Sequence, residues 1–485
     1  EWIHVGEGRD EGAVDVDRWA GTIWEALTEA DDAFTEGRVD PVLITEVGAS
    51  GGGAIVLKPQ RITHGPRYAV IDGLGRWSTG TTEDVASGCR QGLVEAGVEP
   101  AAVGYLDVLV EGLDWPNRPV AAGLLDAYQV DEDAASSYCP SSMPSRHAGA
   151  AFALIKAVSA LTRGFIPAWG DRSELKAPNR WLDTPFYAVA RAKPWFAGDR
   201  PRVAVLHDGS PASDRQGGHL VLSESEYAVA ADAAIARSDY VLIPLGAASR
   251  DGFEARLAAL EAEVDAAGSP ADLRDVARRA YEIYRDQSDV PYVMALVAQG
   301  RAGMAREIAY AREGLSKVFE RGEVWRSPRG STLTTRPLGP RGRVAFVYPG
   351  AFNAYLDLGR DLFHLFPFLY ESFGHVVSDI GRSVRDRALY PRSLTPLTKK
   401  ERRAREAALL ADPPALIESG TSSAVLFTTI LREGFGVHPH TALGYSLGEV
   451  SMLWALGVWQ DGDRGLRAWR SSPLFKSQLS GPKTL

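Results

Sequence analysis

The sequence has little cysteine and no long apolar run, and both shortages exclude classes of protein. Only two of its 485 residues are cysteine, Cys89 and Cys139, which cannot form a disulfide framework or a zinc site, so no metal is expected. No segment approaches the roughly 20 apolar residues of a membrane span. The first residues, EWIHVGEGRD, have neither the basic region nor the apolar core of a signal peptide. We therefore expect a protein of the reducing cytoplasm, with no membrane partner.

Clusters of basic residues are missing as well. The chain has 53 Lys and Arg against 62 Asp and Glu, and its net charge of −9 is spread along its length. Binding to nucleic acid or to an anionic membrane surface needs clustered positive charge, so neither is an expected partner. The one dense charged run, KKERRARE at residues 399–406, mixes both signs and predicts a solvent-facing helix.

What is present is the composition of a folded globular protein, with 45% hydrophobic and 24% charged residues, long enough for about three domains. The first residue, Glu1, is not an initiator methionine, which suggests a segment of something longer. Up to about residue 226, strands and helices alternate. They include a buried strand at 51–58, a helix at 147–164 that is apolar nearly all round, and a closing pair of strands at 202–209 and 217–224.

The texture changes between residues 238 and 337, where amphipathic helices alternate with strands. One helical face is expected to carry Phe253, Leu257, Leu260 and Val264, at spacings of three and four residues. Such a stripe is ordinary core packing. The glycine- and proline-rich stretch RPLGPRGR at 336–343 marks a boundary.

A serine stands between two glycines in GYSLG, residues 444–448, where a short strand leads into a helix. The G-x-S-x-G spacing favours a tight turn that pushes the serine hydroxyl out above the strand end. The N–H groups at the start of the next helix can then face an oxyanion that forms on a bound carbonyl. This context favours Ser446 as a nucleophile over a structural serine.

A serine nucleophile needs a base to take its proton, and a positioned base contributes about 10²–10⁴-fold to the rate. The chain has nine histidines, and none follows Ser446. His438 and His440 lie just before the elbow strand and are expected at the surface. The sequence therefore offers no base for Ser446.

Two stretches, RVAFVYPGAFNAYLDLGRDLFHLFP and ALGYSLGEVSMLWALGVW, resemble the acyltransferase domain of type I polyketide, polyunsaturated fatty acid and heterocyst glycolipid synthases. The resemblance implies that Ser446 carries the acyl group, malonyl above all, and that the N–H groups of Leu447 and Ala351 receive the oxyanion. Arg470 matches the arginine that pairs with the malonyl carboxylate, and Tyr445 replaces the usual histidine at a substrate-binding position. The family's histidine base then lies beyond Leu485, so this segment should transfer poorly by itself.

The first part resembles the C-terminal half of a ketosynthase, through ASGGGAIVLK, GYLDVLVEG and HAGAAFALIK. His147 matches a catalytic histidine, with altered spacing to the conserved Lys156, and Leu109 occupies the place of the other histidine. The half that carries the cysteine nucleophile is not in the sequence. Loss of a histidine on a retained scaffold is similar to a chain-length factor, a non-condensing ketosynthase relative that pairs with an active ketosynthase.

The resemblance thus implies an α/β protein of three domains. They are the C-terminal half of a thiolase-like ketosynthase fold (1–226), an α/β linker (227–337), and part of the α/β-hydrolase-like core of an acyltransferase (338–485). The expected reaction is acyl transfer from coenzyme A to Ser446 and on to the phosphopantetheine thiol of an acyl carrier protein, with no bound cofactor. Expected partners are that carrier, an active ketosynthase, and a second chain in a homodimer or heterodimer.

Two other functions stay open at this point. The chain could be a non-catalytic scaffold or chain-length factor that organises an active ketosynthase and its carriers. It could also be a serine esterase of the α/β-hydrolase type, which shares the elbow but leaves the ketosynthase-like region unexplained.

Overall fold

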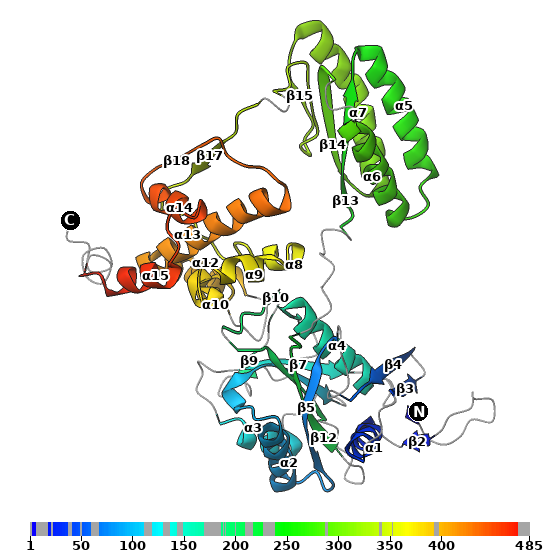
Figure 1. The fold of residues 1–485 in the computed structure, drawn as a ribbon, viewed down its shortest axis with the longest axis vertical. Helices are drawn as coiled ribbons and strands as arrows, with labels where there is room; N and C mark the ends of the chain where they lie inside the picture. The colour runs from blue at the N-terminus through cyan, green and yellow to red at the C-terminus, as the bar shows by residue number, and fades with distance from the viewer. Residues whose placement is uncertain are drawn as a thin grey trace. The chain divides into compact units, whose positions relative to one another are not determined.

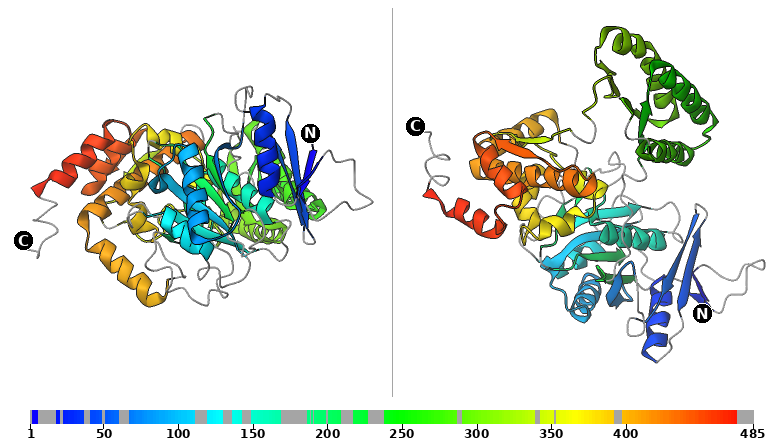
Figure 2. Two further views of the ribbon diagram at one scale, coloured as in Figure 1. Left: turned by 90° about the horizontal axis from the view of Figure 1, so that it is seen from below. Right: turned by 45° about the horizontal axis from the view of Figure 1, so that its top comes forward.

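The computed structural model of the chain divides into two compact units (Figures 1 and 2). The first contains residues 1–232, 347–437 and 443–485, and the second contains residues 233–346 and 438–442. Helices and strands occur in both, so the predicted α/β character is confirmed. The structure describes residues 2–5, 18–20, 23–36, 41–48, 51–59, 67–110, 119–129, 136–142, 149–168, 186–187, 189, 191–198, 200–208, 217–226, 238–286, 290–338, 342–351, 353–391 and 397–473. None of the helices within these ranges is long and apolar enough to cross a bilayer.

A six-stranded mixed sheet organises the first 226 residues. The four strands β11, β6, β7 and β9 run parallel, and β12 lies antiparallel between β11 and β5. The predicted closing pair of strands is therefore confirmed. In spatial order the strands are β5 (Val70–Trp77), β12 (Gly217–Ser223), β11 (Val203–Asp208), β6 (Val103–Val110), β7 (Ser136–Ser142) and β9 (Phe186–Tyr187).

Alternate residues of β11 face opposite sides of this sheet, as the two-residue period of a strand requires. Val203 and Val205 belong to a core with the helices α2 (Thr82–Glu95) and α3 (Pro119–Ala127). Ala204 and Leu206 belong to a second core with α1 (Ile23–Thr35) and α4 (Gly149–Arg163). Figures 1 and 2 show α2 and α3 together on one side of the sheet and α4 on the other.

Two sequence expectations about burial are wrong. The strand predicted at 51–58 forms β4 (Gly51–Leu57), but it lies at the edge of a four-stranded sheet, and Val56 is 58% exposed. The helix predicted at 147–164, whose nearly all-round apolar surface indicates burial on most sides, is described as α4 and leaves Phe152 and Ile155 each 40% exposed. Both errors have one cause: apolar composition identifies an element that can be buried but does not identify its neighbours.

The other strands of the four-stranded sheet that contains β4 are β2 (Arg18–Ala20), β1 (Trp2–Val5) and β3 (Val42–Gly48).

The second unit is a four-stranded sheet with three long helices, and it overlaps the predicted linker. The predicted stripe is confirmed, since Phe253, Leu257, Leu260 and Val264 are the buried residues of α5. The strands, in order, are β13 (Tyr240–Ala247), β14 (Tyr292–Gln299), β16 (Thr332–Thr334) and β15 (Trp325–Arg326), and the helices are α5 (Arg250–Ala266), α6 (Pro270–Asp286) and α7 (Gly300–Arg321).

The last part of the chain is built around the helix α13 (Pro413–Thr429), most of which is buried. The charged run KKERRARE forms most of α12 (Lys399–Leu410), and its residues are exposed except for the partly buried Glu406, so the predicted solvent-facing helix is confirmed. Two short strands, β17 (Ala345–Tyr348) and β18 (Thr441–Gly444), pair beside α13. The remaining elements are α8 (Leu362–Leu365), α9 (Leu369–Gly374), α10 (Ile380–Val384), α11 (Asp386–Leu389), α14 (Leu447–Ala455) and α15 (Gly462–Ser471).

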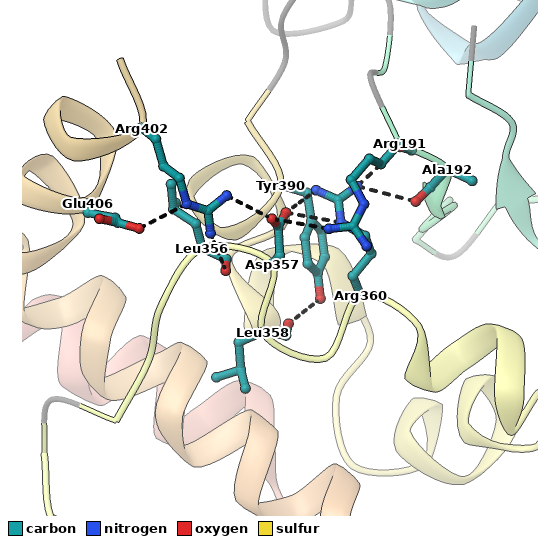
Figure 3. A network of polar contacts seen from close by, with 9 residues as sticks. All are labelled: Arg191, Ala192, Leu356, Asp357, Leu358, Arg360, Tyr390, Arg402 and Glu406. Carbon is teal, nitrogen blue, oxygen red and sulfur yellow. Dashed lines mark hydrogen bonds and ion pairs between the residues drawn. The ribbon is translucent and has the colours of Figure 1, made fainter. Parts of the chain in front are cut away.

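A polar network ties the loop before α8 to a segment from the first part of the chain (Figure 3). Asp357 pairs with Arg360, with Arg402 at 3.1 Å and with Arg191 at 3.7 Å. Arg360 is 8% exposed and donates to the carbonyl groups of Arg191 and Ala192. Partial burial opposes ionisation of Asp357, but the arginines outweigh it and hold the pKa of this carboxyl below its usual value. Asp357 is therefore ionised, and its carboxylate links the loop before α8 to the segment that contains Arg191.

We expect Asp357→Asn to lower the free energy of unfolding by roughly 1.5–3 kcal/mol, because it leaves the buried Arg360 without its counter-charge. Asn tolerates the left-handed backbone at this position, where φ is 72°, so the variant isolates the charge. Asp126→Asn is the matched control, since the Arg90–Asp126 pair is about half exposed and should contribute little. Equal urea midpoints for the two variants would contradict this interpretation.

Candidate active site

Ser446 lies at the turn between β18 and α14 in a strained backbone conformation. Its φ is 54° and its ψ is −120°, which L-residues with a side chain rarely adopt. Such a conformation costs roughly 1–3 kcal/mol and persists only where the surrounding structure imposes it. Ser446 is exposed, so the turn presents its hydroxyl to solvent. This is the geometry that the G-x-S-x-G spacing predicts.

The two flanking glycines explain what imposes this turn. A Cβ on Gly444 would lie 2.2 Å from the carbonyl carbon of Gly448, and a Cβ on Gly448 would lie 2.3 Å from the carbonyl oxygen of Tyr348. Both are contacts with backbone, which cannot move aside cheaply. The start of α14 therefore packs directly on β18 and on the end of β17. Only glycine fits at either position, and Ser446 must turn the chain within that space.

The N-terminus of α14 supplies a hydrogen-bond donor beside Ser446. The N–H of Gly448 donates to Tyr445 at 2.8 Å, and the N–H of Glu449 donates to the carbonyl of Ser446 at 3.1 Å. The N–H of Leu447 comes first in the helix, where no preceding helical carbonyl can accept it. It also lies at the positive end of the helix dipole. Leu447 is thus suited to the oxyanion role that the sequence assigns to it.

The turn that follows β17 lies against the serine. A Cβ built on Gly350 would come within 3.6 Å of the Ser446 Cβ and 3.3 Å of the Tyr445 carbonyl. Its neighbour Ala351 is exposed, as is Tyr445, at 79%. The structure therefore brings together Ser446, Leu447, Tyr445 and the turn that carries Ala351, four of the positions singled out in the sequence.

No histidine is hydrogen-bonded to the Ser446 hydroxyl in the part of the chain that the structure describes. His438 and His440 are exposed, which confirms their expected surface positions. His440 has other hydrogen-bond partners. Its ring Nδ1 accepts from the backbone N–H of Val344 at 3.1 Å, and its backbone N–H donates to the Val344 carbonyl at 2.8 Å. Both bonds lie at the far end of the β17–β18 pair from Ser446.

Arg470 is held by a buried carboxylate. On α15, its guanidinium donates two bonds to Glu418, at 2.8 and 3.0 Å, and Glu418 is 1% exposed. Arg385 forms an ion pair with the same carboxylate. Two guanidinium groups around one carboxylate leave a net positive charge. The Arg470 guanidinium, however, is already hydrogen-bonded to Glu418 and is not free to bind a substrate carboxylate. Its match to the substrate-binding arginine of the acyltransferases stays a prediction.

The ketosynthase-like positions have structural partners of their own. Lys156, on α4, places its Nζ 2.8 Å from Asp107, a fully buried carboxylate on β6. The Tyr105 hydroxyl donates to the same oxygen at 2.9 Å. Lys156 therefore compensates a buried charge, which would otherwise be costly. His147 lies outside the described residues.

A buried group that the sequence argument missed lies between the six-stranded sheet and α2. Cys89 on α2 is 3.8 Å from His207 on β11, and the Nδ1 atoms of His207 and His219 are 3.1 Å apart. The Tyr128 hydroxyl contacts the other nitrogen of His219 at 3.0 Å. Counting cysteines excluded a metal site but overlooked histidine partners. The signal was available, because the predicted closing strands carry one histidine each.

Burial changes the acid–base behaviour of this group. All four side chains are fully buried. Desolvation lowers the pKa of His219 to about 3 and holds that of His207 well below its usual value, with His219 as a second cause. The same burial raises the pKa of the Cys89 thiol and of the Tyr128 hydroxyl. At neutral pH both histidines are therefore neutral.

Sequence comparison finds relatives among large synthases, although no known family profile matches the chain. The chain is 26% identical over 497 residues to a polyunsaturated fatty acid synthase protein of Thraustochytrium sp., covering 94% of this chain and 23% of that protein. It is 25% identical over 380 residues to the spectinabilin polyketide synthase system protein NorA of Streptomyces orinoci, covering 76% and 18%. The chain thus spans less than a quarter of the length of these relatives.

Ketosynthases are among the solved structures to which the chain is similar. The ketosynthase from module 6 of the bacillaene synthase of Bacillus subtilis superposes with a TM-score of 0.34 and 17% identity, covering 61% of this chain and 59% of that one. An oxazolomycin ketosynthase domain of Streptomyces albus gives a TM-score of 0.36 and 18% identity, covering 60% and 58%.

The strain at Ser446 can be measured with two variants that both remove the hydroxyl. We expect Ser446→Gly to be more stable than Ser446→Ala by roughly 1–3 kcal/mol, because only glycine adopts this φ and ψ without cost. At an unstrained position the order would be reversed, since glycine loses more backbone entropy on folding. Urea unfolding of the two proteins gives the comparison, and a more stable alanine variant would refute the strained turn.

The buried histidines predict an acid-sensitive fold. In the unfolded chain they titrate near pH 6.5, whereas in the folded protein they stay neutral to much lower pH. Protonation therefore favours unfolding below pH 6.5, and each histidine should remove about 1.6 kcal/mol of stability between pH 6.5 and pH 5. The loss should end only near pH 3, where folded His219 also titrates.

Urea midpoints of the metal-free protein, measured from pH 7.5 to pH 5, give this slope. A His219→Gln variant should show a shallower slope whatever its absolute stability, while the exposed His375→Gln should follow the wild type. Parallel slopes for all three proteins would show that His219 is already protonated in the folded state.

Proposed function

We propose that residues 338–485 act in acyl transfer, as expected for a relative of polyunsaturated fatty acid synthases and type I polyketide synthases. An acyl group, malonyl in the first place, would pass from coenzyme A to Ser446 and then to the phosphopantetheine thiol of an acyl carrier protein. The observation that carries the proposal is the strained, exposed turn of Ser446 at the N-terminus of α14.

In the first half-reaction the Ser446 oxygen attacks the thioester carbonyl and forms a tetrahedral oxyanion. The Leu447 N–H is suited to bind this oxyanion, and the N–H of Ala351 is the second proposed donor. One such donor is worth about 10²–10³-fold in rate. Collapse breaks the carbon–sulfur bond, and coenzyme A leaves as a thiol. The hydroxyl proton passes to the departing sulfur through a general base.

The second half-reaction reverses these steps with another thiol. The carrier's phosphopantetheine sulfur attacks the acyl-serine ester, and Ser446 regains its proton as the carbon–oxygen bond breaks. The net positive charge that Arg470 and Arg385 leave around Glu418 suits a substrate that carries a carboxylate. Tyr445, 79% exposed beside the serine, is placed to contact the acyl group.

We assign no condensation to the ketosynthase-like region. Leu109 stands where the family has a catalytic histidine, and Lys156 is bound to the buried Asp107. A role like that of a chain-length factor fits these residues: the region would pair with an active ketosynthase and help to shape its binding tunnel. Exposed apolar residues on α4, Phe152 and Ile155, fit a surface that another domain or chain covers.

A wholly non-catalytic scaffold is the second candidate function. It is favoured by one observation, the occupation of Arg470 by Glu418. A free-standing serine esterase is disfavoured, because the match to the Thraustochytrium synthase covers 94% of the chain, including the part that an esterase does not need.

Acylation of Ser446 separates these functions. The full-length natural protein that contains this sequence, incubated with malonyl-CoA, is expected to gain the mass of one malonyl group, because Ser446 forms an ester that survives denaturation. Ser446→Ala should gain none. Ser471→Ala, which removes an exposed serine hydroxyl on α15, is the matched control and should be acylated like the wild type. An adduct that persists in Ser446→Ala, or no adduct on the wild type, would leave the scaffold as the surviving function.

A further inference from the structure

Cys89, His207 and His219 bring three metal-binding atoms together in the interior of the ketosynthase-like region. Their ligand atoms all lie within 4.8 Å of one another, and each residue is fully buried. They come from three elements, α2, β11 and β12, and the two histidines face each other across an antiparallel strand pair. None of them takes part in the proposed acyl transfer. The geometry points to a binding site for a d¹⁰ metal ion, Cu⁺ or Zn²⁺, held by these three side chains.

The spacing of the three atoms matches a coordination sphere. An ion bound at about 2.0–2.1 Å from nitrogen and 2.3 Å from sulfur, with tetrahedral angles, separates two nitrogens by about 3.4 Å and nitrogen from sulfur by about 3.6 Å. The two Nδ1 atoms are 3.1 Å apart, and the sulfur is 3.8 Å from the Nδ1 of His207. For these two pairs an ion requires shifts of only a few tenths of an ångström, and the Cys89 sulfur lies within 4.8 Å of the ligand atom of His219.

The surroundings of the two histidines suit metal binding. Histidine binds metal as the neutral imidazole, and full burial disfavours an unpaired charge on either ring. Tyr128 contacts the Nε2 of His219, whose other ring nitrogen contacts His207. A partner at that position fixes the ring and its tautomer, as outer partners of metal-bound histidines commonly do.

Charge and ligand number favour the monovalent ion. Binding releases the Cys89 thiol proton to solvent and forms one metal–sulfur and two metal–nitrogen bonds. One thiolate and two neutral imidazoles carry a single negative charge, which Cu⁺ cancels, whereas Zn²⁺ would leave a positive charge in a fully buried site. Structural zinc also takes four ligands almost always, and the described residues offer three here. Soft thiolate ligands suit both ions.

Metal content tests the site directly. Because the ligands are enclosed, metal should enter as the chain folds, so the tag-free full-length protein is produced in medium supplemented with copper or, separately, with zinc. After gel filtration, elemental analysis should find about one ion per chain. Cys89→Ala should lose it, while His375→Gln, a matched change of an exposed histidine, should keep it. X-ray absorption on the wild type needs no variant and should report one sulfur and two nitrogen neighbours.

Each outcome decides a part of the proposal. Copper that is lost in Cys89→Ala supports both the site and the monovalent ion. Zinc that is lost in the same variant supports the site and overturns the choice of ion. Absence of both metals, equal metal in Cys89→Ala, or a sphere without sulfur overturns the site.

Discussion

The candidate active site depends on one packing constraint, the direct backbone contact of α14 with β18 and β17. Gly444 and Gly448 leave no room for a Cβ, and the space they leave forces Ser446 into a conformation that few residues adopt. The strain has two consequences for chemistry: the hydroxyl faces solvent, and the Leu447 N–H lies beside it at the positive end of a helix. A looser turn would let the serine relax and hydrogen-bond to the helix, as ordinary N-cap serines do.

Buried polar contacts made by α13 fix the elements around this turn. Thr428 bonds to the Tyr348 hydroxyl at 2.9 Å, at the end of β17, and Thr421 bonds to Ser451 of α14 at 3.3 Å. Glu418 holds Arg470 of α15 from the same helix. Each neutral bond contributes only about 1 kcal/mol, but a buried polar group without its partner costs more. Small hydroxyl residues in α13 thus give these elements one preferred arrangement.

Much of this organisation is predictable from the sequence, because it follows from local rules. The elbow, the stripe of α5 and the charged face of α12 each depend on spacing within a few residues. The relation to polyunsaturated fatty acid and polyketide synthases, carried by motifs, is confirmed by the relatives found. The features that the sequence did not predict depend on residues that are far apart in the chain. The partner of Arg470 is 52 residues away, Cys89 and His207 are separated by 118 residues, and no local pattern reports either pair. The exposure of Val56 and of Phe152 likewise depends on which element packs against them.

A crystal structure of the chain tests the central claim most directly, through the backbone at Ser446. We expect a positive φ near 54°, a hydroxyl open to solvent and a Leu447 N–H without a protein acceptor. A Ser446 with ordinary negative φ, its hydroxyl turned inward and capping α14, would contradict the claim and leave the turn an ordinary helix start.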